Sequence, residues 1–174
     1  GHLFKLKQPE EYDIKYKKWS KDTLPIFFEN WQTVPDQSKV GRVNVIGNLL
    51  KQAELVVHAG DPDDEGQLLI DEILEYFDYK GKVMRLSTND NNPEYIRKQF
   101  GKMESNKKHL PNGYSARARS VADFIVGINY SRFFTLSNRT RDLMNVGRVQ
   151  TPTLGLVVAR DMLIENHTKV CYYE

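Results

Sequence analysis

Residues 58–74, HAGDPDDEGQLLIDEIL, join two different local patterns. The apolar run that leads into them, ELVVHAG at residues 54–60, is short and closed by glycine, which is typical of a buried parallel strand. After Gly66 the spacing becomes helical: Leu69, Ile70, Ile73, Leu74 and Phe77 fall on one face, and Asp71, Glu72 and Glu75 on the other. The segment therefore predicts a strand, an acidic loop and a helix.

The flanking sequence continues this alternation. Residues 38–53 predict an amphipathic helix, KVMRLST at residues 82–88 a second strand, and residues 91–100 a helix capped by Asn92 with Pro93 at its first position. Alternating strands and helices favour an α/β fold with a parallel sheet. The residues before 38 show no sustained period and are interpreted as a packed loop with one short strand at HLFKL.

The second half of the chain has a helical pattern. A polar stretch with proline and glycine, residues 104–113, precedes it. Residues 115–134 place apolar side chains at helical intervals, and residues 151–166 begin with Thr151 as a cap and Pro152 at the first helical position. We therefore expect a mainly α-helical subdomain after the α/β part.

Composition indicates a globular chain without a membrane helix or an internal disulfide. The 174 residues are 40% hydrophobic, which suffices for one domain with or without a subdomain. No apolar run approaches the roughly 18 to 20 residues that a membrane helix needs, so we expect no membrane partner and a cytoplasmic location. Cys171, the single cysteine, can form no internal disulfide and by itself makes no zinc site. Net charge is +2, but residues 115–160 contain arginines and no lysine, whereas residues 61–78 contain no basic residue.

The acidic loop is a candidate metal site. Asp61 and Asp63 are two positions apart at the carboxyl end of a predicted parallel strand, so their carboxylates can converge on one point. Mg²⁺ prefers oxygen ligands and typically binds one or two carboxylates together with substrate phosphate. Glu65 is close enough to be a further ligand or a proton-transfer group. The alternative is that the acids complement the dipole of the following helix, which would explain one or two of the four carboxylates. It would not explain all four, because crowded like charges repel unless a cation or a proton relieves them.

The same segment closely resembles the metal-binding segment of Toprim domains in type IA DNA topoisomerases, most nearly those of the topoisomerase III branch. Further matches follow in the family's order: GHLFKL at residues 1–6, YKKWSKDTLPI at 16–26, SARARSVADFIVGINYSR at 115–132 and NVGRVQTPTLGLVVARD at 145–161. Together they span nearly the whole chain. The resemblance implies a Toprim domain lacking its first strand over residues 1–110, a helical DNA-binding subdomain over 111–166 and the start of another domain over 167–174.

The resemblance also implies an activity and its residues. Such enzymes bind single-stranded DNA, use Mg²⁺, cleave the strand through a tyrosine, pass another strand through the gap and reseal it. Asp61, Asp63 and Glu65 would be the Toprim acids, and Arg148 and Gln150 would bind DNA. Independently, Arg148, Gln150 and Thr151 precede or begin a predicted helix, where a guanidinium, an amide and free N–H groups can meet a phosphate. Arg117 and Arg132 would extend this track, whereas Arg119 is interpreted as pairing with Asp123 on a solvated helix face.

The sequence departs from the family in three respects. Asp64 stands where the family usually has arginine, the strand with a further glutamate would precede Gly1, and no tyrosine lies in the family's Tyr-x-Arg-Ser/Thr-Asp/Glu context. We therefore expect a fragment of a topoisomerase III-like enzyme that is inactive by itself. Two alternatives stay open: a non-catalytic DNA-binding module or truncated gene product, and a Toprim metal-dependent nuclease.

Overall fold

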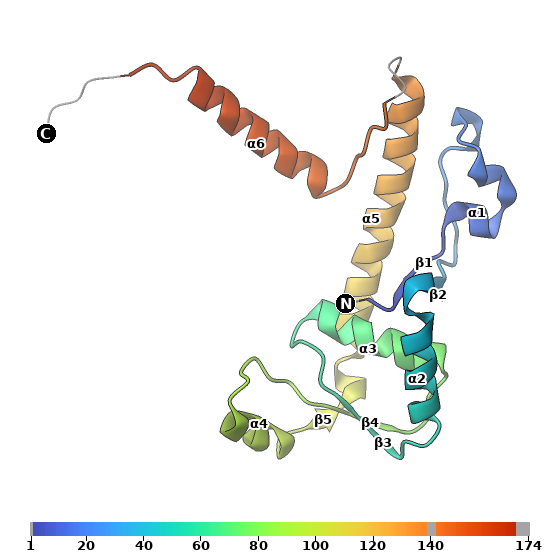
Figure 1. Ribbon diagram of the computed structural model, residues 1–174, viewed down its shortest axis with the longest axis vertical. Coiled ribbons are helices and arrows are strands. Elements are labelled where there is room, and N and C mark those ends of the chain that lie inside the picture. The colour runs from blue at the N-terminus through green and yellow to red at the C-terminus, as the bar shows by residue number, and fades with distance from the viewer. Residues whose placement is uncertain (1, 139–141, 170–174) are drawn as a thin grey trace, which may run out of the picture. The chain divides into compact units, whose positions relative to one another are not determined.

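A computed structural model describes residues 2–138 and 142–169 (Figure 1). The chain forms two compact units. Unit 1 consists of Gly1–Gln8 and Glu29–Ala122, and unit 2 of Pro9–Phe28 and Asp123–Glu174. The division falls inside the long helix α5, Leu110–Ser137, which contributes to both units. The predicted domain boundaries at residues 110 and 166 stay a prediction, and part of the predicted last segment lies outside the described residues.

Unit 1 contains two small sheets. Strands β1 (Phe4–Leu6) and β2 (Thr33–Pro35) pair antiparallel. Strands β3 (Leu55–His58) and β4 (Lys82–Arg85) pair parallel, and β5 (Glu104–Ser105) joins β4 antiparallel. Helices α2 (Val40–Leu50), α3 (Asp64–Tyr76) and α4 (Pro93–Phe100) alternate with these strands. The mixed α/β class is confirmed, and the two predicted strands, β3 and β4, do pair parallel; β5, which the sequence did not predict, adds an antiparallel edge.

Helix packing and capping explain why these elements form. Phe4, Val43 and Ile73 make the buried core of unit 1, where β1, α2 and α3 meet. Gly47 of α2 faces the Phe77 ring so closely that a Cβ there would lie 2.4 Å from it, which favours glycine at this contact. At α4 the Asn92 side chain accepts a hydrogen bond from the Glu94 N–H, and Pro93 follows it, as the sequence predicted.

Burial corrects two sequence expectations in unit 1. The strand β3 is not buried on both faces, because Leu55 and Val57 are exposed. Glu72, assigned to the polar face of α3, is only 8% exposed, while Leu68 on the same helix is buried as well. The buried surface of α3 is therefore wider than its apolar stripe, and it includes a carboxyl group.

Unit 2 packs the segment 9–28 against the second half of α5. This segment contains α1 (Pro9–Tyr12) and short 3-10 helices, and Ile26 in it is fully buried. The Asn129 side chain of α5 accepts a hydrogen bond from Ile26 N at 2.6 Å and donates one to Ile26 O at 2.9 Å. The predicted packed loop is thus held by one amide that satisfies both backbone groups of a buried residue.

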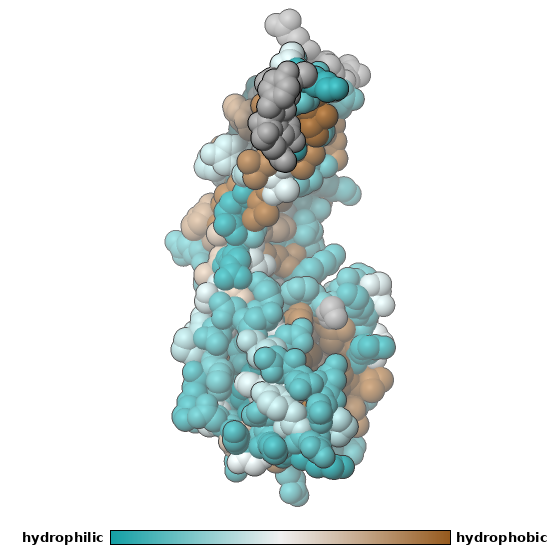
Figure 2. Space-filling model, turned by 90° about the vertical axis from the view of Figure 1, so that its left-hand side faces the viewer, coloured by the Kyte–Doolittle hydropathy of each residue, from teal (hydrophilic) through white to brown (hydrophobic). Residues whose placement is uncertain are grey.

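Helix α6 spans Gln150–Glu165 and starts earlier than predicted. Thr151 is not its cap: Val149 occupies that position without a side-chain hydrogen bond, and Thr151 Oγ1 instead accepts from Gly147 N at 3.0 Å. Hydrophobic side chains are exposed in the upper part of Figure 2, and α6 carries seven large exposed ones: Leu154, Leu156, Val157, Val158, Met162, Leu163 and Ile164. Nevertheless, none of the described helices is long and apolar enough to cross a membrane.

Candidate functional site

The acidic loop lies at the carboxyl end of β3, beside the end of its parallel neighbour β4. Asp61 and Asp63 are exposed there, and Asp64 and Glu65 form the first turn of α3. Asp63 Oδ1 accepts a hydrogen bond from Gly66 N at 2.6 Å, so this carboxylate caps α3. Helix capping therefore explains the acid at position 63. It does not explain the exposed carboxylate of Asp61, which does not cap α3.

The loop folds back tightly onto the start of α3. A Cβ on Gly66 would lie 2.4 Å from Asp61 O and 2.6 Å from Asp61 N. Any larger residue at position 66 would push the loop away from the helix. Gly66 thus sets the distance between the Asp61 backbone and the helix that carries Asp64 and Glu65.

A buried arginine fixes the other side of the loop. Arg85, the last residue of β4, is 4% exposed. Its Nη1 donates to Gly60 O at 2.7 Å and its Nη2 to Asp61 O at 2.5 Å. Two loop carbonyls are therefore satisfied by one planar guanidinium, which holds the backbone that presents Asp61.

His58 completes this support. Its Nδ1 lies 2.9 Å from Arg85 Nη1, and because a guanidinium can only donate, Nδ1 accepts and the proton resides on Nε2. Nε2 then donates to Gln67 O at 3.2 Å. Burial, together with the adjacent Arg85 charge, lowers the pKa of His58, so the ring is neutral at pH 7.

A second polar cluster lies behind the first. Gln67 Nε2 donates to Asp71 Oδ2 and to Asn106 Oδ1, each at 2.8 Å, and Asn106 Nδ2 donates to Asp71 Oδ1 at 2.8 Å. These residues and Arg85 were not identified from the sequence. One signal could have found Arg85: a histidine and an arginine lie within the two predicted strands, and such groups are buried only with partners.

Arg119 forms ion pairs with two of the four carboxylates of the acidic loop, those of Asp64 and Glu65. Its guanidinium lies 3.7 Å from Asp64 and 3.5 Å from Glu65, so the predicted pairing of Arg119 with Asp123 is wrong. Asp61 and Asp63 have no ion-pair partner among the described residues. Their carboxylate oxygens are the donor type that Mg²⁺ prefers. In residues 2–138 and 142–169 no three His, Cys, Asp or Glu side chains are already arranged around a metal position, so the metal roles of Asp61, Asp63 and Glu65 stay predictions.

The predicted DNA-binding residues lie in different environments. Arg148 is half exposed and forms an ion pair with Asp123, next to Gln150 and Thr151 at the start of α6. Arg117 forms an ion pair with Glu75. Arg132 is 3% exposed, donates to Tyr16 O at 2.7 Å and lies over the Trp19 ring, an environment that favours a structural role. Contact with DNA stays a prediction for all five.

Comparison with known proteins gives a consistent result. A family model described as DNA topoisomerase matches residues 111–174. DNA topoisomerase 3 of Salmonella typhimurium is 42% identical and that of Pasteurella multocida 40% identical, both over the whole chain. The chain spans 28% of the length of each. The solved full-length topoisomerase I of Thermotoga maritima has the same fold over 97% of this chain and 26% of its own, with a TM-score of 0.65 and 24% identity.

These matches agree with the order of motifs along the sequence and with the strand, loop and helix built around Asp61. Over its whole length the chain is similar to a segment of the DNA topoisomerase 3 proteins, and its residues 111–174 match the family model described as DNA topoisomerase.

Proposed function

We propose that this chain supplies the Mg²⁺-binding loop and part of the single-stranded DNA path of a topoisomerase III-like enzyme. Asp61 and Asp63 hold the cation, and Glu65 joins them or moves a proton at the scissile phosphate. When bound, Mg²⁺ neutralises charge on the phosphate and orients it. The chain's own residues hold the loop, keep Asp61 and Asp63 accessible and bind the DNA backbone.

One observation carries this proposal. Arg85 and His58 are buried, yet both are used to fix the backbone of an exposed acidic loop. Burying a charged arginine is costly unless its hydrogen bonds are satisfied, so a site that only capped a helix would not require it. The arrangement is the one expected where two carboxylates must be held close together despite their repulsion.

The proposed DNA contacts are electrostatic and independent of sequence. Arg148 can exchange its exposed partner Asp123 for a phosphate, because both side chains are close to half exposed. Thr151 N and Thr153 N already donate to Gly147 O and Val149 O, and Pro152 has no N–H, so the phosphate contact would be made by side chains. Gln150 and Thr151 lie at that end of the helix.

A metal-binding measurement tests the first part. Mn²⁺ is added to the full chain, free Mn²⁺ is quantified by electron paramagnetic resonance, and Mg²⁺ is used as competitor. We expect D61N and D63N each to weaken binding at least tenfold. E54Q is the matched control, because Glu54 is exposed and lies just before the other end of β3. Equal affinities of D61N, D63N and the unchanged chain would refute the metal assignment.

A strand-cleavage assay separates the proposal from the two alternatives. End-labelled single-stranded DNA is incubated with the chain and Mg²⁺ and resolved on a denaturing gel. Under the proposal the strand is retarded in a native gel but stays intact under denaturing conditions. Cut strand without a protein adduct, lost in D61N, would indicate a nuclease. DNA binding that ignores Mg²⁺ and tolerates D61N would indicate a non-catalytic module.

A further inference from the structure

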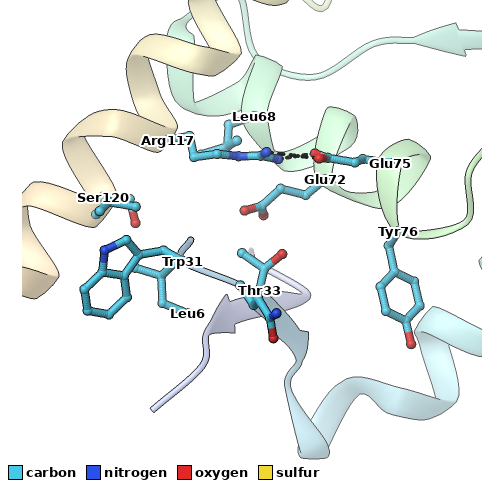
Figure 3. Close-up of a pocket in the computed structure, with 11 residues that line it drawn as sticks. Leu6, Trp31, Thr33, Leu68, Glu72, Glu75, Tyr76, Arg117 and Ser120 are labelled. Atoms are coloured by element: carbon cyan, nitrogen blue, oxygen red, sulfur yellow. Dashed lines mark hydrogen bonds and ion pairs between the residues drawn. The ribbon is translucent and has the colours of Figure 1, made fainter. Parts of the chain in front are cut away.

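Unit 1 contains a cavity of about 340 Å³ that is separate from the acidic loop. Residues of α3 and α5 and residues at and before β2 line it, among them Glu72, Tyr76, Arg117, Ser120 and Trp31 (Figure 3). Nothing in the proposed function uses it. Its volume lies within the range of small-ligand sites and exceeds many times the roughly 30 Å³ that one water occupies in the liquid.

Glu72 is the unusual residue of this cavity. It is 8% exposed, and its carboxyl has no hydrogen bond or ion pair with any described residue. Figure 3 shows the carboxyl among the lining side chains, beneath the Arg117–Glu75 pair. Desolvation is the main reason that the pKa of Glu72 is raised; the positive charge of Arg117 opposes this shift, and the neighbouring Glu75 adds to it. A buried carboxyl without a partner is rare in folded proteins, and it points to a group that the chain does not itself supply.

The adjacent Arg117 lowers the pKa of Glu72 through its charge, but its hydrogen bonds and ion pair go to Glu75. Arg117 donates through both terminal nitrogens to Glu75, with Nη1 3.2 Å from Oε1. With Glu72 and Glu75 ionised, the three charged side chains carry a net charge of −1. The remaining wall includes the aromatic rings of Trp31 and Tyr76 and the hydroxyls of Thr33 and Ser120. A carboxylate in a cavity whose wall also includes aromatic rings and hydroxyls suits an organic cation, which can pair with the acid and lie against a ring.

We propose that this cavity binds an alkylammonium or guanidinium group, with Glu72 as its counter-ion and Trp31 as part of its wall. The group comes from a free amine such as a polyamine or from a basic side chain of a protein partner; the chemistry at Glu72 is the same.

Nuclear magnetic resonance of the indole N–H groups tests the proposal. The chain has two tryptophans, and W19F identifies which signal belongs to Trp31. Cadaverine represents the free amine, Nα-acetyl-lysine N-methylamide the side chain, and n-pentanol an uncharged molecule of similar length. We expect a saturable shift of the Trp31 signal with at least one of the two cations and none with n-pentanol. The tighter of the two cations identifies the source.

Two variants and one control assign the effect to Glu72. E72Q keeps the shape and removes the charge, and we expect it to weaken cation binding at least tenfold. S120F fills the cavity from the surface side of α5 while leaving Glu72 intact, so it should block binding even if E72Q proved poorly folded. E94Q, an exposed acid of α4 that does not line the cavity, should bind as the unchanged chain does. Absence of a saturable Trp31 shift with both cations, or equal binding by E72Q, would overturn the proposal.

Discussion

Arg85 Nη1 lies 2.9 Å from His58 Nδ1, and the two residues face each other in the parallel register of β4 and β3. Each is the last residue of its strand. Because both side chains are buried, the carboxyl edge of the sheet ends in a polar pair and not in an apolar core. The loop that starts there is positioned by hydrogen bonds to Gly60 and Asp61, so its geometry depends on one guanidinium.

Replacing Arg85 by alanine should destabilise the fold by about 2 to 4 kcal/mol. The substitution leaves Gly60 O and Asp61 O without the Arg85 donor in a partly buried setting, and buried His58 Nδ1 keeps only the longer hydrogen bond from Gly60 N at 3.3 Å. These losses cost more than that of a hydrogen bond at the surface. Urea unfolding followed by circular dichroism measures the change. R97A on the exposed side of α4 is the control and should remain within about 0.5 kcal/mol. A similar small effect for R85A would mean that the loop does not depend on the guanidinium.

Stability should decrease as the pH falls through about 6.5, the ordinary pKa of histidine. The pKa of His58 is lowered in the folded chain, so between the folded and unfolded pKa values the unfolded chain binds more protons. Protonation therefore favours unfolding in that range. The contribution of His58 to the free energy of unfolding is fully present only above the unfolded pKa. Urea midpoints at pH 5 to 8 measure this dependence. H58Q should flatten this part of the curve, whereas H167Q, at an exposed position, should leave it unchanged.

Removing Arg119 should strengthen divalent-cation binding about two- to fivefold. Arg119 lies 3.5 Å from Glu65 and 3.7 Å from Asp64, so it competes with a cation for the same negative charge. The effect is modest because the side chains are partly exposed and screened. Mn²⁺ titrations of R119Q measure it. R117Q is the matched control two residues away, since Arg117 pairs with Glu75. Weaker binding by R119Q would instead assign Arg119 a supporting role in the site.

The sequence predicted the parts of the site that depend only on residues close together in the chain. The change from an apolar run to a helical period after Gly66 indicated β3 and α3, and Asn92 with Pro93 indicated the start of α4. It did not predict Arg85, because the residue that fixes the loop lies 24 positions beyond Asp61 and becomes its neighbour only when the strands pair. The burial of Glu72 was missed for the same reason: the surface of α3 that is covered depends on how α5 and β2 approach it.

Arg148 should contribute one phosphate contact to single-stranded DNA binding. Fluorescence anisotropy with a labelled oligonucleotide between about 50 and 200 mM salt gives the dependence of log K on log salt concentration, and each phosphate contact contributes roughly 0.7 to its slope. R148Q should weaken binding and reduce the slope by that amount. D123N should strengthen binding, because Asp123 holds the Arg148 guanidinium when DNA is absent. R160Q on exposed α6 is the control with the same charge change. If R148Q and R160Q have equal slopes, the helix start at Gln150 is not a phosphate site.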